Sequence, residues 1–231
     1  MMKSGDLFNL FQEVKEVDIN DLLLNSVNKY PTKIALKYAD QAYTYQQLYN
    51  RVCKLANAML AQGVHYQSKV ALICQNCSAY LEIIFACAKI GAISEHFNWR
   101  LAPVKLLELL EDSSASLIYI SNNNKEIYYY LKENLSREVT YVFLEEGVDG
   151  GLGYEQFIGD WPEICESMGL KDSDVAIQLY TSGTTGKAKG VLLTNSNVLT
   201  ETLVLVMEAG WRYDEVFLCV LPLFHVACVT A

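Results

Sequence analysis

The sequence predicts an α/β protein with mostly parallel sheets flanked by helices. Short apolar runs alternate along the chain with segments whose apolar residues recur at helical spacing. Repeated strand–helix–strand units favour parallel pairing, because each connecting helix returns the chain to the edge where the previous strand began. Hydrophobic residues make up 52% of the 231 residues and prolines number only four, so the chain can bury a full core.

In the first part of the chain, two strands precede the first long helix. That helix has apolar residues at helical spacing from Leu48 to Met59. Thr44 and Gln47 suit a capping box at its start, and Gly63 suits its C-terminal stop. A second helix over 78–90 is expected to end at Gly91. The strands expected here are 34–39, 43–45, 69–74 and a short one around Ile93.

The second part of the chain continues the alternation. The expected helices are 103–111, which has proline in its first turn, 125–134 and 197–209. The expected strands are 117–120, 140–144, 175–180, 191–194 and 216–221. Segments 145–153 and 181–190 are rich in glycine and are expected to be loops.

Charge and cysteine content restrict the partners and the compartment. Lys and Arg number 18 and Asp and Glu 27, which gives a net charge of −9, so non-specific nucleic-acid binding is excluded. The seven cysteines are an odd number and no signal peptide is apparent, which predicts a reducing, cytoplasmic setting. Cys74 and Cys77 form the one C-x-x-C and follow an apolar run, so buried structural thiols are expected there.

The most apolar segment is the tail, 216–231. It contains Pro222 and is shorter than the roughly twenty residues that span a bilayer, so no transmembrane segment is expected. It ends without a polar cap, which predicts a truncated chain with apolar surface that self-association can cover.

The segment 181–190 carries the chemistry. Its glycines let the backbone approach a ligand, and its hydroxyls and two lysines supply donors and positive charge, which suits a polyphosphate. It is not a common P-loop, because Thr181 and Ala188 stand where that motif needs glycine and a hydroxyl residue. Composition alone leaves a flexible surface loop as the alternative.

The order Thr-Ser-Gly-Thr-Thr-Gly-x-x-Lys-Gly at 181–190 resembles the phosphate loop of the adenylate-forming (AMP-binding) enzymes, which include acyl-CoA synthetases. Three further segments resemble the same family: 43–56, Gly91 to Leu101 with Asn98-Trp99-Arg100-Leu101, and 221–226 with its Leu-Pro-Leu-Phe-His-Val. Together they cover the chain from about residue 20 onward. Three departures are Ala188, Asn195 and Cys228, where the family usually has proline, histidine and glycine.

The resemblance implies that the chain is the N-terminal part of an AMP-binding domain. It implies a nearly complete α/β subdomain at about 66–206 and parts of a second, incomplete one at 1–65 and 207–231, without the C-terminal domain. The implied activity is ATP-dependent conversion of a carboxylic acid, possibly a fatty acid, to an acyl-adenylate and then to a CoA thioester. ATP, Mg²⁺ and CoA are the implied cofactors and co-substrates, and this chain alone is not expected to turn over.

The resemblance also implies roles for particular residues. Lys189 and His225 would act in catalysis, Lys189 by offsetting phosphate charge and His225 by lining the carboxylate side of the acyl pocket. No residue of the chain is assigned as a metal ligand. The implied nucleotide-binding residues are Thr181, Ser182, Gly183, Thr184, Thr185, Gly186 and Lys189.

Two alternatives stay open. One is an amino-acid-activating adenylation domain, and the other is a non-catalytic nucleotide-binding or interaction fragment. Outside the motif, His65 is expected in solvent, whereas His96, Arg100 and the tyrosines 128–130 are expected to have structural roles.

Overall fold

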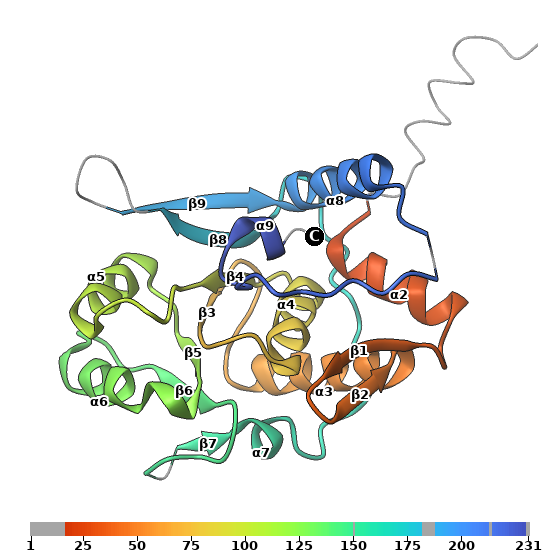
Figure 1. Ribbon diagram of the computed structural model, residues 1–231. Helices are drawn as coiled ribbons and strands as arrows, with labels where there is room; N and C mark the ends of the chain where they lie inside the picture. Colours follow the sequence, from red (N-terminus) through yellow and green to blue (C-terminus); the bar gives the residue numbers. More distant parts are fainter. Residues whose placement is uncertain (1–16, 150, 182–187, 213, 230–231) are drawn as a thin grey trace, which may run out of the picture.

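The structure, a computed structural model, describes residues 17–149, 151–181, 188–212 and 214–229 (Figure 1). In this part of the chain, a seven-stranded sheet has the strand order β7-β6-β5-β3-β4-β8-β9. Every pairing in it is parallel except that of β8 with β9. The predicted mostly parallel α/β fold is therefore confirmed. The strands are β3 (Lys69–Ile73), β4 (Ile93–His96), β5 (Leu117–Ile120), β6 (Thr140–Phe143), β7 (Leu152–Gly153), β8 (Val175–Thr181) and β9 (Lys189–Thr194).

Helices cover both faces of the sheet (Figure 1). One face carries α3 (Tyr45–Ala61), α4 (Ser78–Ile90) and the short α7 (Tyr154–Ile158), with α2 (Ile19–Lys29) beside α4. The other face carries α5 (Pro103–Ser113) and α6 (Lys125–Asn134). The remaining elements are the hairpin β1 (Ile34–Tyr38) and β2 (Gln41–Thr44), the 3-10 turn η1 (Asn122–Asn124), α8 (Asn195–Ala209) and α9 (Val226–Val229).

Alternate residues of the central strand β3 enter two different cores. Val70 and Leu72 pack with α3 and α4, whereas Ala71 and Ile73 pack with α5 and α6. All four side chains are fully buried. A strand that is buried on both faces needs a continuous apolar sequence, and this explains the run Val70-Ala71-Leu72-Ile73.

The predicted helix ends are confirmed at both α3 and α4. Thr44 Oγ1 accepts from Gln47 N at 3.2 Å, and Gln47 Oε1 accepts from Thr44 N at 2.9 Å, which is the reciprocal capping box. Gly91 ends α4 with a φ of 69°. A Cβ at Gly91 would lie 2.7 Å from Cδ2 of Tyr66 and 2.9 Å from Cδ2 of Leu170, so both space and backbone require glycine.

The structure also corrects several predictions. The strand predicted at 216–221 is wrong: the segment is irregular, and Val216, Leu218 and Val220 are 93%, 79% and 76% exposed. Among the described strands none runs beside it, so its backbone has no ladder to join. The helices α2 and α7 were missed, and β8 and β9 extend to Thr181 and Lys189 into the predicted loop. No helix in the described part is both long and apolar enough to cross a bilayer.

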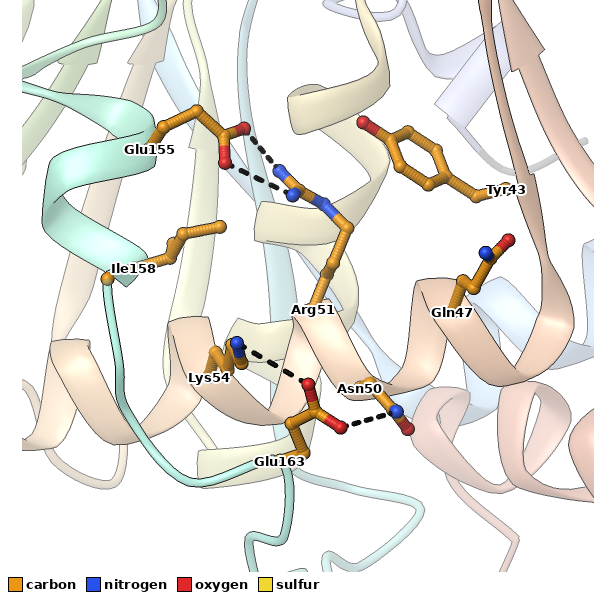
Figure 2. Close-up of a pocket in the computed structure, with 9 residues that line it drawn as sticks. Tyr43, Gln47, Asn50, Arg51, Lys54, Glu155, Ile158 and Glu163 are labelled. Carbon is orange, nitrogen blue, oxygen red and sulfur yellow. Dashed lines mark hydrogen bonds and ion pairs between the residues drawn. The ribbon is translucent and has the colours of Figure 1, made fainter.

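An ion-pair network ties three helices together, and Figure 2 shows its Arg51–Glu155 part between α3 and α7. Arg51 of α3 donates through Nε to both carboxylate oxygens of the fully buried Glu82 of α4, at 3.0 Å each. Its terminal nitrogens contact the carboxylate of Glu155 of α7, with Nη2 to Oε1 at 2.6 Å. Tyr154 also donates its hydroxyl to Glu82 Oε2 at 2.7 Å. Arg51 therefore compensates a carboxylate that burial alone would make costly.

Candidate functional site

The connections after β3 and β4 leave the sheet in opposite directions. The chain passes from β3 into α4 on one face and from β4 into α5 on the other. Because these two strands are neighbours, their carboxyl ends form a topological switch point, the place where open parallel sheets bind ligands.

A cavity of about 340 Å³ lies at this edge of the sheet, and we call it the switch-point cavity. The turn after β3 contributes two of its lining residues, the segment after β4 two more, and the C-terminal tail the rest. The lining residues are Gln75, Asn76, Trp99, Arg100, Val220 and Pro222.

Asn76 holds the tail segment in place at this cavity. Its Nδ2 donates to the Leu221 carbonyl at 2.8 Å, and its Oδ1 accepts from the Leu223 backbone N–H at 2.8 Å. Arg100 adds a second link, because its Cζ lies 5.0 Å from the Trp99 ring centroid and 5.8 Å from that of Phe224. The two sequence segments singled out at 98–101 and 221–226 therefore meet in space. Arg100 was expected to tie strands together, but the rings it contacts lie in loops after β4 and before α9.

We expect Asn76→Ala to release the tail segment locally. Removing both hydrogen bonds, each worth about 1 kcal/mol, should speed amide exchange at Leu223 on the order of tenfold, as measured by hydrogen–deuterium exchange. Asn50→Ala is a matched control, because the Asn50 side chain donates an exposed hydrogen bond to Glu163 Oε2 at 2.7 Å, and Glu163 is not part of the tail. If the amide exchange rate of Leu223 is unchanged in Asn76→Ala, the two Asn76 hydrogen bonds do not hold the tail segment in place.

The β8–β9 hairpin presents the glycine-rich loop. Thr181 and Lys189 are register partners at the end of the hairpin where the loop joins the two strands, and both side chains are exposed. Thr181 Oγ1 donates to the Lys189 carbonyl at 3.5 Å. The other predicted nucleotide-binding residues, Ser182, Gly183, Thr184, Thr185 and Gly186, lie outside the described residues, as does Lys187.

Two contacts fix this hairpin relative to the sheet. The Tyr180 ring stacks on Phe97, with centroids 5.4 Å apart, and its hydroxyl donates to Asp112 Oδ2 at 2.9 Å. A Cβ at Gly190 would lie 2.5 Å from Gln178 Nε2, so this motif position suits glycine. Because Phe97 directly follows β4, the loop and the switch-point cavity are built on neighbouring strands.

His225, predicted to line the acyl pocket, is exposed in the turn before α9 and does not line the switch-point cavity. His65 is exposed, as predicted. His96 is buried, with Nδ1 2.8 Å from the Tyr80 hydroxyl and Nε2 3.0 Å from Ser94 Oγ, and burial lowers its pKa to about 3. This confirms its structural role as a neutral ring. Among the tyrosines, Tyr128 is buried and Tyr129 is exposed.

The three departures from the family pattern lie in buried or partly buried surroundings. Ala188 packs partly buried against the core beneath α5 and α6. Asn195 is fully buried and its Nδ2 donates to the Lys171 carbonyl at 3.2 Å. Cys228 is also buried.

Glu95 is a fully buried carboxyl group on β4, on the opposite side of the strand from His96. Lys69 Nζ lies 3.4 Å from its Oε1, and burial raises the pKa of Glu95 to about 7. Since the ordinary value is 4.5, the folded chain binds more protons than the unfolded chain between about pH 4.5 and pH 7. The contribution of this group to stability therefore falls as the pH rises through that window.

We expect Glu95→Gln to stabilise the protein at about pH 8, by up to about 3 kcal/mol, because the substitution removes a buried charge. At about pH 4, where the wild-type carboxyl group is mostly neutral in both states, the gain should nearly vanish. Urea unfolding of the variant and the wild type measures the difference in stability at each of the two pH values. An equal gain in stability at both pH values would show that removal of a buried charge is not the cause of the stabilisation.

A second cleft, of about 260 Å³, lies between α3 and α7 (Figure 2). Its charged groups are paired within it: Arg51 with Glu155, and Lys54 Nζ with Glu163 Oε1 at 3.4 Å. Asn50 also donates to Glu163. The charges of Arg51, Lys54, Glu155 and Glu163 are therefore paired inside this cleft.

The fold and the site define a class: an open, mostly parallel α/β protein with a crevice at a topological switch point and, on the neighbouring strand β8, a hairpin that carries a glycine-rich sequence motif. The chain matches the model of the AMP-binding enzyme family over residues 23–231, and it belongs to that family. The sequence resemblance is thereby confirmed.

Three relatives illustrate the match. A feruloyl-CoA synthase from an Amycolatopsis species is 33% identical over 199 residues, which are 86% of this chain and 38% of that protein. A crotonobetaine/carnitine–CoA ligase from Escherichia coli is 30% identical over 191 residues, 80% of this chain and 37% of that one. The structure of an anthranilate CoA ligase, AuaEII, in complex with anthranoyl-AMP has a TM-score of 0.79 at 25% identity, over 89% of this chain and 39% of that one. The chain therefore spans less than half the length of these relatives.

Proposed function

We propose that the protein to which this chain belongs is an acyl-CoA synthetase. In the proposed reaction, a substrate carboxylate attacks the α-phosphate of ATP, which gives an acyl-adenylate and pyrophosphate. The CoA thiol then attacks the acyl carbon and releases AMP. The observation that carries the proposal is that the Thr181–Lys189 end of the hairpin and the Trp99–Arg100 wall of the switch-point cavity follow the neighbouring parallel strands β8 and β4.

The chain's own residues supply positioning and charge in this proposal. Two anions must meet in the first step, so a cation at the phosphate loop lowers the barrier by offsetting their repulsion. Lys189 has this role, together with hydroxyl donors from Thr181, Ser182, Thr184 and Thr185. The glycines Gly183 and Gly186 permit the loop its turns.

Mg²⁺ would neutralise phosphate charge when ATP binds. Within the described ranges, no group of three or more His, Cys, Asp or Glu side chains is arranged to hold a metal ion. We therefore assign no magnesium ligand to this part of the chain and derive no step through the ion.

The substrate is proposed to be a carboxylic acid with an apolar body. Trp99, Val220 and Pro222 give the switch-point cavity apolar walls, which favour an aryl or fatty acid over a highly polar one. The named relatives act on feruloyl, carnitine and anthranilate groups, and they support the breadth of the class. A reducing, cytoplasmic setting is supported by seven free thiols in the described part of the chain.

The test is pyrophosphate release by the complete protein, with ATP, Mg²⁺ and a panel of aryl acids, fatty acids and amino acids. We expect release that depends on an aryl or fatty acid. Release with amino acids alone would favour the amino-acid-activating alternative, and no release with any acid would refute the proposal.

The second candidate function is a non-catalytic nucleotide-binding or interaction fragment, and the exposed apolar side chains of the tail favour it. Val216, Leu218 and Val220 together with Met207 of α8, which is 80% exposed, are the surface that self-association would cover. Light scattering that finds a monomer, with calorimetry that finds no ATP affinity, would remove this candidate.

The division into a subdomain at 66–206 and parts of a second is likewise a proposal, supported by a sheet that runs from Lys69 to Thr194.

A further inference from the structure

Arg100 lines the switch-point cavity and has no anionic partner there. In the part of the chain that the structure describes, no carboxylate forms an ion pair with its guanidinium group. The hydrogen bond that Arg100 does form is donated by its backbone N–H, to Asn98 Oδ1 at 3.0 Å. The residues that line the cavity include neither Asp nor Glu. The cavity therefore has a positive charge and no counter-charge among the residues described.

The cations that line two other cavities are already engaged. In the cleft between α3 and α7, Arg51 and Lys54 both form ion pairs with carboxylates. A cavity of about 450 Å³ lies between the end of α6 and β6, where Arg137 pairs with a carboxylate of α5 and Lys132 donates to a tyrosine hydroxyl at 3.0 Å. Within the described ranges, Arg100 is the cation that lines one of these three cavities and lacks such a partner. This difference favours a ligand as the partner of its charge.

Aromatic rings hold the guanidinium group of Arg100 at the cavity. Its Cζ lies 5.0 Å from the ring centroid of Trp99, a lining residue, and 5.8 Å from that of Phe224. A guanidinium group on an aromatic face keeps its N–H groups free for two parallel hydrogen bonds to a carboxylate, because these groups lie in its own plane. The Gln75 side chain lines the same cavity and adds an amide donor. The site thus fits a planar anion.

The remaining walls favour an apolar body for the same ligand. Trp99, Val220 and Pro222 supply these walls, so a ligand that satisfies the whole lining combines an apolar body with an anionic group. In the proposed reaction, the attacking carboxylate must reach the phosphates at the Lys189 end of the hairpin, whereas Arg100 follows β4. A carboxylate that Arg100 holds through both oxygens has its lone pairs engaged and is a poor nucleophile. The group at Arg100 is therefore a second one that does not react.

We propose that the switch-point cavity selects dicarboxylic acids with an apolar body, and that Arg100 binds the carboxylate that does not react. Arg100 is then a specificity residue, since it distinguishes a diacid from a monoacid of the same shape. This inference names the substrate class of the proposed function and rests on it. Binding of the diacid at Arg100 needs neither ATP nor CoA, so it can be measured without the reaction.

The test compares matched acids that differ only in the second carboxylate: terephthalate with 4-methylbenzoate, and adipate with hexanoate. In each pair, a methyl group replaces the carboxylate assigned to Arg100. Pyrophosphate release by the complete protein gives kcat/KM for each acid, and titration calorimetry without ATP gives its affinity. We expect the diacid of at least one pair to exceed its monoacid at least about tenfold in both quantities, because charge-assisted hydrogen bonds distinguish the two.

Variants locate the effect at Arg100. Arg100→Met should reduce the preference for the diacid over the monoacid at least about tenfold. Arg100→Lys, which keeps the charge and loses the planar fork, should reduce it less. The matched control is Arg212→Met, because Arg212 is an exposed arginine that pairs with Asp214 and does not line the cavity, so the preference should equal that of the wild type. Thermal unfolding of each variant checks that it remains folded.

Three results would overturn the inference. The first is equal kcat/KM and equal affinity for both members of each pair. The second is an equal loss for both acids in Arg100→Met, which would mean that Arg100 holds the reacting carboxylate. The third is a loss confined to the KM for CoA, which would mean that the anion is a phosphate of CoA.

The inference and the proposed function fail separately. Pyrophosphate release with monoacids and no preference for diacids would leave the proposed function and refute the dicarboxylate site. No release with any acid, together with diacid binding that Arg100→Met weakens, would refute the proposed function and leave the site.

Discussion

Arg51→Ala is expected to destabilise the protein by about 3–5 kcal/mol, the largest loss of stability that we predict for a single substitution. The substitution leaves Glu82 fully buried without the guanidinium that lies 3.0 Å from both of its carboxylate oxygens. Burial already raises the pKa of Glu82 in the intact network. Denaturant unfolding of the variant and the wild type measures the difference.

The control is Lys54→Ala on the same helix. Lys54 forms an ion pair with the half-exposed Glu163, so its removal should cost less than about 1 kcal/mol. Adding Glu82→Gln to Arg51→Ala should recover part of the loss, because the buried charge is then gone. Equal losses in Arg51→Ala and Lys54→Ala, with no recovery in the double variant, would contradict the account of the network.

Lys189→Ala is expected to weaken ATP binding by the complete protein about tenfold to a hundredfold. The physical basis is a charge-assisted hydrogen bond from the Lys189 ammonium group to a phosphate of ATP, worth about 1.5–3 kcal/mol. Lys189 is the first residue of β9, where the loop meets the sheet. Titration calorimetry with ATP measures the change.

The matched variant is Lys187→Ala, at a variable position of the family motif. We expect its ATP affinity to stay within about threefold of the wild type. If both substitutions weaken ATP binding equally, the assignment of the phosphate-binding charge to Lys189 alone is wrong.

Much of the fold was predictable because local signals and tertiary packing agree. The helix at 78–90 and the strand at 117–120 have the predicted bounds, and both combine a clear apolar pattern with a glycine or polar stop. The helix α2 was missed although its buried residues Ile19, Leu23 and Val27 recur every fourth position and Asp18 caps it. Its three consecutive leucines obscure that spacing.

The tail shows where local signals fail. Its apolar, β-branched residues favour a strand at 216–221, but strand formation needs a neighbouring strand, and the described part of the chain offers none there. Propensity therefore predicted an element that tertiary pairing does not support.

The candidate site was predictable only where a motif exists. The glycine-rich loop, the Asn98–Leu101 segment and the segment around His225 were found from residue order. Asn76 was missed, because its role depends on two backbone groups of Leu221 and Leu223, far away in the sequence. Its position directly after a central parallel strand is the one signal that could have found it.

The central claim is that the complete protein activates a carboxylic acid as an acyl-adenylate. The most direct measurement follows a heavy oxygen isotope from the carboxylate of the best acid in the panel, with ATP and CoA present. We predict that AMP carries one labelled oxygen, since the carboxylate attacks the α-phosphate and its oxygen stays with AMP when the thiol displaces it. Label in inorganic phosphate, with none in AMP, would indicate an acyl-phosphate route and contradict the claim.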